Sequence, residues 1–462
     1  IIEQKPLKGA FTRKKPKNTS LSFETWSNSI FQKNTERDLK IKNPLKSTAI
    51  RLINQFQYSF MKSPSSKGLF ITENGTLMPT HYINSLVGKD LIPLDSVNNS
   101  MRMAKFVQDS LERRGIKLLF LIAPGKPSFN LDQVPKYFTS QLNANNNYKQ
   151  FIESCKKYDI EYIDYKRILL ENKDSFEYPI FTKFGVHWSG NTIAHVTKDL
   201  FEYINNSVND IEIPKIEILP GEKTVRDYKF TDYDIGESMN LMFFESEETL
   251  HYPRVVIKEG EKKKPKLIAI GDSFFQSFVN FDNTFNEVFD KSSKFYFYNK
   301  IVDWPIKYQE VGIKTEYLDM KKEINSTDII IIEMSEQNTK YLGYQFIHQL
   351  YNLFTAINTV NEGAHLIYDD ISKNEKSLKV SSETINTLKI NRTNIVKNIA
   401  FNRALKGEGN NLKQINKIIA NMRSNPKWLD KLKKQAKEKE ISLEKNMLLN
   451  AKYLIKQRQK SN

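Results

Sequence analysis

The chain has 462 residues, 39% of them hydrophobic and 12% aromatic. This is enough apolar material for a globular body but too long a chain for one ordinary core, so we expect one large domain with at least one appendage. Seventy Lys and Arg against 54 Asp and Glu give a net charge of +16, which indicates a polyanionic neighbour: nucleic acid, an anionic membrane face or an acidic polymer. A single cysteine, Cys155, excludes an intramolecular disulfide and a Cys-rich metal site, and we expect a buried, inert thiol.

Residues 1–60 are predicted to be an N-terminal helical segment, because apolar residues from about residue 20 onwards recur every three to four positions. The chain begins at Ile1 rather than at a methionine, which is consistent with removal of a signal peptide or membrane anchor. The lack of an apolar run of ~18 to 20 residues therefore does not establish a cytoplasmic location. Residues 67–83 are predicted to form a hairpin whose turn is Asn74-Gly75.

Residues 61–400 are predicted to form an α/β domain, because apolar strands alternate with helices along this part of the chain. Near-continuous apolar strands indicate a parallel sheet covered on both faces, with ligands beyond the carboxyl ends of the strands. An irregular, charged insertion is expected at about 205–265. The expected helices are 100–115, 147–159, 190–204 and 344–356, and the expected strands are 116–124, 160–165, 267–270, 294–299, 328–334 and 364–369.

Residues 406–462 are predicted to be a basic helical extension. The segment carries 15 Lys and Arg against 5 Asp and Glu, a net charge of +10. Three helices are expected, and the second begins at Asn425 as cap and Pro426 in the first turn. The charges indicate either the solvated face of an amphipathic appendage or a surface for a membrane partner, anionic lipid or polymer.

Ser273 is the candidate nucleophile. It follows the apolar strand 267–270 and Gly271, at the point where a helix is expected to begin. A serine there lies at a strand end over a helix N-terminus, where free backbone N–H groups would face an oxyanion on its substrate. Plain helix capping by Asp272 or Ser273 explains the same position equally well.

A nucleophilic serine needs a base, and His187 is the best placed of six histidines, because it follows the strand 160–165 by a loop and precedes a helix. It would therefore lie at the same edge of the sheet as Ser273. His195, on that helix, is expected to cap or pack. No pair of histidines has metal-ligand spacing, so no metal is assigned.

The order of these motifs resembles the AlgJ/AlgX-type polysaccharide O-acetyltransferases, which have an SGNH-hydrolase-like fold. The matching pieces are the hairpin at 67–83, the stretch 119–129 (LFLIAPGKPSF), the His187-Trp188-Ser189 loop and the Gly271-Asp272-Ser273-Phe274 turn. Over residues 20–370 the resemblance implies an acyltransferase outside the cytoplasm, held by an anchor missing from this chain. It also implies a membrane-bound O-acyltransferase as partner, a polysaccharide acceptor, and no cofactor beyond the acetyl donor.

The same resemblance assigns Ser273 as nucleophile and His187 as base. The family's Asp-x-His motif is broken here, because Gly185 stands two residues before His187. An aspartate on the far ring nitrogen fixes the imidazole tautomer and stabilises the imidazolium. The candidate replacements are Asp272, which could instead hold the turn, and Asp232 or Asp234.

Three further residues are candidates for substrate binding. Asn338 follows the strand 328–334 and would donate to an oxyanion or serve as a turn residue. Lys126 would attract an anionic substrate or be solvated. Trp188 would stack on a sugar ring or pack in the core.

The sequence therefore predicts an O-acetyltransferase that works through an acyl-serine. An esterase of the same fold and a non-catalytic polysaccharide-binding subunit, suggested by Gly185, are the alternatives. Nucleic-acid binding is not expected, because no recognition motif accompanies the basic tail.

Overall fold

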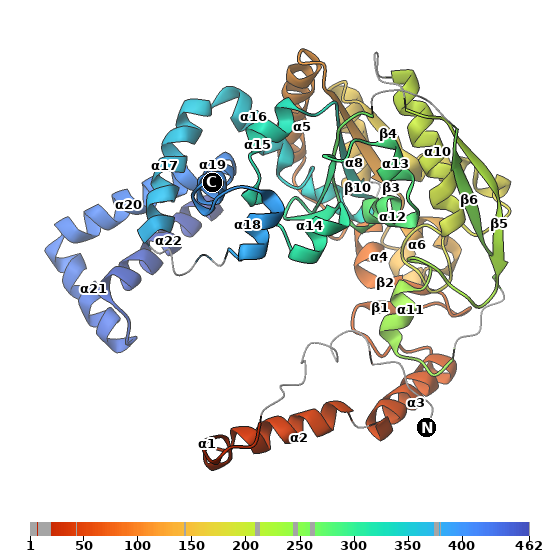
Figure 1. Cartoon of the computed structure of the whole chain (residues 1–462), viewed down its shortest axis with the longest axis horizontal. Helices are drawn as coiled ribbons and strands as arrows, with labels where there is room; N and C mark the ends of the chain where they lie inside the picture. Colours follow the sequence, from red (N-terminus) through yellow and green to blue (C-terminus); the bar gives the residue numbers. More distant parts are fainter. Residues whose placement is uncertain are drawn as a thin grey trace.

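The computed structural model describes residues 7, 20–42, 44–142, 145–207, 213–243, 248–258, 264–373, 378 and 380–461. Figure 1 shows a central sheet with helices on both sides, an N-terminal helical arm below it and a helical C-terminal part to one side. Parts of the predicted segments 1–60 and 205–265 fall outside the described residues. The domain boundaries expected from the sequence stay a prediction.

A six-stranded sheet in the order β4-β3-β10-β7-β8-β9 forms the centre of the molecule. The first five strands run parallel and β9 is antiparallel to β8. The predicted α/β fold with a mostly parallel sheet is confirmed. The bounds are β3 Lys117–Ala123, β4 Tyr162–Asp164, β7 Leu267–Gly271, β8 Lys294–Phe297, β9 Ile301–Trp304 and β10 Ile329–Ser335.

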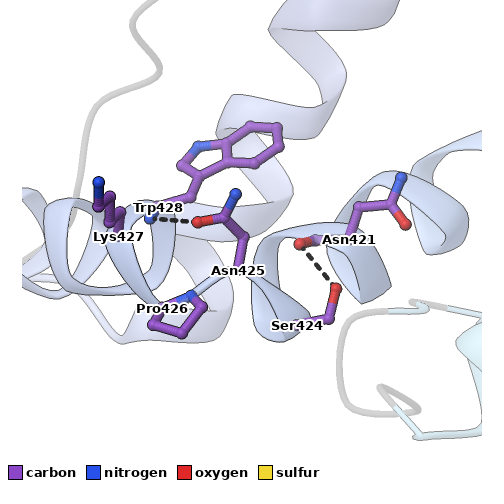
Figure 2. A pocket seen from close by; sticks show the side chains of 6 residues that line it. All are labelled: Asn421, Ser424, Asn425, Pro426, Lys427 and Trp428. Carbon is purple, nitrogen blue, oxygen red and sulfur yellow. Dashed lines mark hydrogen bonds between the residues drawn. The ribbon is translucent and has the colours of Figure 1, made fainter.

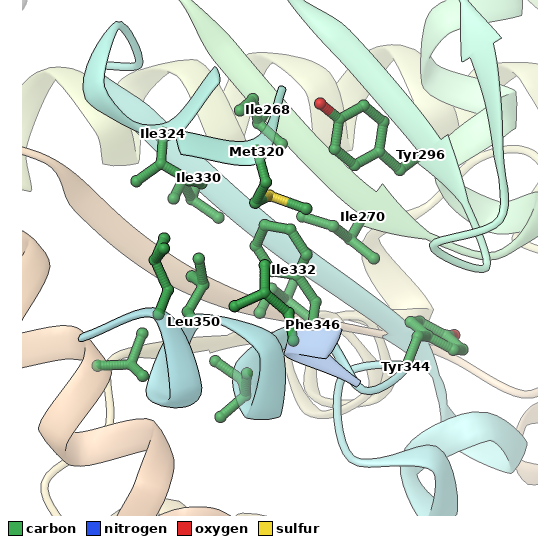
Figure 3. Packing of buried hydrophobic residues seen from close by; sticks show 14 of the residues in the cluster. Ile268, Ile270, Tyr296, Met320, Ile324, Ile330, Ile332, Tyr344, Phe346 and Leu350 are labelled. Carbon is green, nitrogen blue, oxygen red and sulfur yellow. The ribbon is translucent and has the colours of Figure 1, made fainter. Parts of the chain in front are cut away.

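Side chains of each strand alternate between two apolar layers, as the period of two of a β-strand requires. In β10, Ile330 and Ile332 pack into one layer, whereas Ile329 and Ile331 pack into the other. Figure 3 shows the first layer, where Ile268 and Ile270 of β7 meet Phe346 and Leu350 of a covering helix. Helices α5 (Leu94–Glu112), α8 (Asn147–Lys157), α15 (Met320–Asn325) and α16 (Phe346–Thr355) cover this side.

The opposite face of the sheet is covered by helices, among them α10 (Gly190–Ser207), which follows the His187 loop, and α12 (Ser273–Phe281), which begins at Ser273. Others are α4 (Thr80–Leu86), α9 (Tyr165–Glu171) and α13 (Thr284–Val288). Because β3, β7 and β10 are parallel, their carboxyl ends lie at one edge of the sheet. The segments after these strands therefore come together there.

The N-terminal helices α1 (Phe23–Ser27), α2 (Ile30–Lys42) and α3 (Pro44–Met61) form the arm in Figure 1. The predicted hairpin is confirmed, with β1 (Leu69–Ile71) antiparallel to β2 (Leu77–Pro79). Gly75 in its turn has φ +85°, a conformation that a glycine adopts without strain. Cys155 is buried, as expected.

Two expectations are wrong. Residues 364–369 lie inside helix α17 (Ile357–Lys373) and not in a strand, since a short apolar run is ambiguous between the two. The described parts of the insertion contain regular structure, because β5 (Ile216–Thr224) and β6 (Leu250–Ile257) form an antiparallel pair and α11 (Asp234–Met239) lies between them in the sequence. Strand β5 is difficult to predict from the sequence, because Pro220 and Gly221 interrupt its alternation of side chains where the register with β6 shifts.

The basic extension consists of α20 (Glu408–Ser424), α21 (Pro426–Glu438) and α22 (Leu443–Ser461), which share an apolar cluster of their own. It follows α18 (Ser382–Leu388) and α19 (Arg392–Leu405), and α20 crosses α17 where Gly409 and Gly363 meet. A pocket of about 640 Å³ lies at the corner between α20 and α21, and Figure 2 shows the side chains that line it. None of the candidate catalytic residues lines it.

The remaining short helices are α6 (Lys126–Phe129), α7 (Lys136–Thr139) and α14 (Ile306–Val311), together with the 3-10 turns η2 (Leu131–Gln133), η3 (Lys173–Ser175), η4 (Thr315–Tyr317) and η5 (Glu336–Tyr341). Of these, α6 follows β3 and η5 follows β10, so both begin at the carboxyl edge of the sheet.

Candidate functional site

His187 lies in the loop between η3 and α10 and is only 6% exposed. Its Nδ1 atom is 2.6 Å from Oδ2 of Asp234. Because a carboxylate accepts, Nδ1 carries the proton and Nε2 carries the lone pair. Nε2 is buried and has no hydrogen-bond partner among the described residues. The imidazole is therefore oriented at one nitrogen and free to accept a proton at the other.

Asp234 is the first residue of α11 and is itself held in place by backbone groups. Its Oδ1 accepts hydrogen bonds from the N–H of Val186 at 2.9 Å and of Ile235 at 2.6 Å. Val186 is the neighbour of His187, so the same carboxylate fixes both the imidazole and the loop that carries it. Of the three carboxylates considered from the sequence, Asp234 is the one that the structure places against His187.

Gly185 explains why this carboxylate comes from a distant segment. A Cβ atom at this position would lie 2.6 Å from Oγ1 of Thr182 and 2.8 Å from the carbonyl oxygen of Thr231. Real Cβ atoms do not approach other atoms this closely. The backbone of the 231–234 segment thus occupies the space that a side chain at 185 would need, and that segment ends at Asp234.

Ser273 is the first residue of α12 and is half-buried at the carboxyl end of β7. As the first helical residue, its backbone N–H has no intrahelical acceptor and faces the positive end of the helix dipole. The next residue, Phe274, packs its ring 4.7 Å from the His187 imidazole, between centroids. The structure thus brings the serine and histidine segments together, and among the described residues no hydrogen bond joins the two side chains themselves.

Asp272 does not face His187, so it is not the partner of the imidazole. Its Oδ1 caps α12 by accepting the N–H of Phe274 at 2.9 Å. Its Oδ2 accepts from the N–H of Ser335 at 3.1 Å and from the hydroxyl of Tyr344 at 3.2 Å. Asp272 therefore ties the nucleophile turn to the end of β10.

Asn338 is bound to Asp272 rather than available to an oxyanion. Its amide Nδ2 donates to Oδ2 of Asp272 at 2.5 Å and to the hydroxyl of Ser335 at 3.1 Å. The predicted oxyanion donor is thus a support for the turn. Beneath that turn, Glu333 accepts the N–H of Asp272 at 2.9 Å, and burial raises the pKa of its carboxyl well above the ordinary value.

Lys126 is not a surface charge, and the prediction that it attracts an anionic substrate is wrong. It is 1% exposed, and its Nζ donates to the carbonyl oxygens of Thr182, Lys183 and Gly185 at 2.7, 3.0 and 2.8 Å. Burial lowers the pKa of this amine to about 7. Lys126 therefore clamps the loop that leads into His187.

Trp188 offers no ring face to a sugar, so of the two roles that the sequence left open, core packing is confirmed and stacking is not. The side chain is 0% exposed, and its Nε1 donates to the hydroxyl of Ser277 at 2.7 Å. Its ring packs against Phe274 and Phe278 of α12 at 5.5 and 5.1 Å between centroids. The contact joins the histidine loop to the serine helix, which is a structural role.

Tyr82 of α4 is a site residue that sequence reasoning missed. It is 8% exposed, and burial together with the nearby charges of Asp272 and Asp234 raises the pKa of its hydroxyl well above the ordinary value. The phenol therefore stays protonated. Tyr82 falls inside the stretch 67–83 that the sequence predicts as a hairpin, where nothing local marks it as a site residue.

Asp232 is expected to make the stability of the protein depend on pH. It is 1% exposed, its Oδ1 has no hydrogen-bond partner, and burial raises its pKa to about 7. The folded state therefore keeps a proton that the unfolded state loses near pH 4, and stability falls as pH rises from about 4 to about 7.

The variant Asp232→Asn lacks this titration. Relative to wild type, its free energy of unfolding is expected to rise by about 2 to 4 kcal/mol between pH 4 and pH 8. Urea unfolding at the two pH values measures this. If the difference in free energy of unfolding between Asp232→Asn and wild type is the same at both pH values, the prediction is contradicted.

No group of three or more His, Cys, Asp or Glu side chains that could hold a metal occurs within the described ranges. In the same part of the chain, no helix is long and apolar enough to span a bilayer.

Comparison with known proteins finds a family model that matches part of the chain. Residues 93–218 match the family model described as the SGNH hydrolase-like domain of the acetyltransferase AlgX. The match includes Lys126, Gly185 and His187 and ends before Asp234 and Ser273. A search of curated proteins found no match.

Three solved structures are similar to the chain. The O-acetyltransferase domain of Pseudomonas putida AlgJ is 14% identical with a TM-score of 0.41, and the match covers 62% of this chain and 99% of that one. Pseudomonas aeruginosa AlgX is 16% identical with a TM-score of 0.42, covering 63% and 68%. Bacillus cereus PatB1 with a sulfonyl adduct is 11% identical with a TM-score of 0.39, covering 61% and 99%. The predicted resemblance is confirmed: the chain carries an SGNH hydrolase-like α/β fold, and its residues 93–218 match the model of the AlgX acetyltransferase domain.

Proposed function

We propose that this protein is an O-acetyltransferase that moves an acetyl group through acetyl-Ser273 onto a hydroxyl of a polysaccharide outside the cytoplasm. The observation that carries the proposal is the state of His187. Asp234 holds its Nδ1 at 2.6 Å, its Nε2 is buried and has no hydrogen-bond partner among the described residues, and its ring lies 4.7 Å, between centroids, from that of Phe274, the residue after Ser273. The acetyltransferase family matched by residues 93–218 supports the same reaction class.

In the first half-reaction the Ser273 oxygen attacks the carbonyl carbon of an acetyl ester or thioester. Nε2 of His187 takes the hydroxyl proton and then gives it to the leaving oxygen or sulfur of the donor, which leaves acetyl-Ser273. The Ser273 N–H and the dipole of α12 lie where negative charge develops on the carbonyl oxygen. Asp234 stabilises the imidazolium between the two proton transfers.

In the second half-reaction a sugar hydroxyl replaces the donor. Nε2 of His187 takes the proton of the sugar hydroxyl, whose oxygen attacks the acetyl carbon, and the same proton returns to the Ser273 oxygen as the ester bond to the enzyme breaks. The products are an O-acetylated sugar and free Ser273. Water in place of the sugar would make the same site an esterase, so the acceptor decides between the two activities.

The donor and the location are part of the proposal. An acetyl group needed outside the cytoplasm has to be delivered there, which fits a membrane-bound O-acyltransferase as partner. The position of Asp234 removes the reason for the non-catalytic alternative, because that alternative rested on the missing carboxylate at Gly185.

The test is the mass of the intact protein after incubation with 4-nitrophenyl acetate. Wild type is expected to gain one acetyl group or to turn over the ester, whereas Ser273→Ala and His187→Ala are expected to do neither. Ser59→Ala changes an exposed serine of α3 and is the matched control. Equal labelling of wild type and Ser273→Ala would reject the nucleophile.

Oligosaccharides added to the acetylated wild type then separate the two activities. Transfer of the acetyl group to sugar faster than to water supports the transferase, and release as acetate alone supports an esterase.

A further inference from the structure

Three tyrosines form a row that begins at the nucleophile turn. Tyr298 follows β8, and its backbone N–H donates to the carbonyl of Gly271 at 2.8 Å, two residues before Ser273. Its ring meets the ring of Tyr344 at 5.4 Å between centroids and nearly at right angles. Tyr344 in turn lies 6.1 Å from Tyr341, with the ring planes 30° apart. The row therefore leads from the turn before Ser273 to η5.

The three residues differ in their exposure to solvent. Tyr344 is 8% exposed and its hydroxyl donates to Asp272, so it is the buried support. Tyr298 is half-buried, and Tyr341 is 51% exposed. Large aromatic side chains open to solvent beside a reactive group favour a ligand with both apolar and hydrogen-bonding surface.

The backbone conformation of the two loops that carry these tyrosines, 298–299 and 342–345, is further evidence that the row has a function. Positive φ angles for non-glycine residues cost of order 1 to 3 kcal/mol each and gather at active sites and ligand clamps. Here the amide Nδ2 of Asn299 donates to the carbonyl of Tyr344 at 3.1 Å and to Oε1 of Gln349 at 2.7 Å, which joins the loops. The non-glycine residues with positive φ in the two loops are Tyr298 (φ 51°), Asn299 (φ 55°), Leu342 (φ 48°), Tyr344 (φ 55°) and Gln345 (φ 64°).

A lysine beside the ring of Tyr341 is fixed by an ion pair, and the ring itself stays exposed to solvent. The Nζ of Lys340 lies 5.3 Å from the ring centroid, and Asp90 holds that ammonium at 2.7 Å. Burial raises the pKa of the Tyr298 hydroxyl above its ordinary value, with the charge of Asp272 as a further cause, so it remains a hydrogen-bond donor.

We propose that Tyr298 and Tyr341 are specificity-determining residues that bind successive sugar rings of the acceptor chain, with Tyr298 nearer to the hydroxyl being acetylated and Tyr341 further along the row. The apolar C–H face of a pyranose ring packs on an aromatic ring, and its hydroxyls reach the phenols. This inference rests on the proposed function, since it names where the acceptor of acetyl-Ser273 lies. It predicts that a polymer binds better than a single sugar, because one ring cannot contact both tyrosines.

The test separates acceptor binding from acyl-enzyme formation. Tyr341→Ala is expected to lower transfer from acetyl-Ser273 to oligosaccharides of four to six units by about three- to tenfold relative to formation of acetyl-Ser273. Transfer to a monosaccharide should change little, and Tyr341→Phe should restore transfer to the longer chains because the ring remains. Tyr453→Ala removes a tyrosine of α22 that is also more than half exposed, and it is the control.

Calorimetric titration of Ser273→Ala protein with cello-, chito- and galacturono-oligosaccharides gives a readout that needs no reaction. The proposal expects at least one series to bind more tightly as it lengthens, and expects Tyr341→Ala in the same background to remove that gain. Failure of every series to bind, or binding that Tyr341→Ala leaves intact, overturns the inference. Failure of Ser273 to become acetylated overturns the proposed function instead.

Discussion

Replacing Asp234 by asparagine is expected to lower the rate of acetyl-Ser273 formation by about 10⁴-fold, or about 5 kcal/mol in the barrier. An asparagine keeps the size of the side chain but lacks the charge that stabilises the imidazolium. Its amide can also donate to Nδ1, which would leave the proton on Nε2, the nitrogen that must accept one from Ser273. Burst kinetics with 4-nitrophenyl acetate measure the rate.

The matched control is Glu237→Gln, which removes a carboxylate one turn further along α11 where the side chain is exposed. It should stay close to wild type. A second variant, Gly185→Asp with Asp234→Ala, returns a carboxylate to the place where the resemblance expects it. It should not restore activity, because the Cβ at 185 meets Thr182 and the 231–232 backbone. Recovery in this double variant, or a wild-type rate in Asp234→Asn, would contradict the assignment.

Replacing Lys126 by methionine is expected to lower the free energy of unfolding by about 3 to 5 kcal/mol. The thioether fills similar space but donates nothing, so up to three buried carbonyl groups lose their partner, and each unsatisfied group costs about 1 to 3 kcal/mol. Lys198→Met on the exposed side of α10 is the control, since its pair with Glu202 is a surface ion pair worth under about 1 kcal/mol. Urea unfolding measures both.

The decrease in the free energy of unfolding caused by Lys126→Met is expected to be larger at pH 9 than at pH 6. Burial lowers the pKa of Lys126 to about 7, so above this pH the folded state has released a proton that the unfolded chain keeps until its ordinary value of 10.5. The stability of wild type therefore rises with pH across this window. The methionine variant lacks this contribution, because its side chain does not titrate. A substrate-binding lysine would behave differently: the variant would keep its stability and bind an anionic donor more weakly.

The sequence predicts those site residues that directly follow or precede a recognisable strand or helix. Ser273 follows an apolar strand and a glycine, and His187 follows a strand and precedes a helix, so both fall at the carboxyl edge of a parallel sheet. Asp234 has no such signal. It lies 47 residues from His187, and the sequence alone left it level with two other carboxylates.

The sequence left the roles of Trp188 and Asn338 open and gave Lys126 two roles at the surface, and the cause is the same for all three. Their side-chain chemistry suits ligands and cores alike, and only burial separates the two uses. In the structure Lys126 and Trp188 are 1% and 0% exposed, and the Asn338 amide is taken by Asp272.

The sequence by itself determined the α/β class, the turn that carries Ser273, the loop that carries His187 and the basic helical extension, because strand and helix periods and cap residues are local properties. Only the tertiary structure decided which carboxylate orients His187, since this depends on the backbone of 231–232 filling the space beside Gly185. It alone also decided that Lys126 clamps a loop and that Tyr298, Tyr344 and Tyr341 form a row. Those relations join segments far apart in the chain, and the pairing of the sheet and the packing of its two layers bring them together.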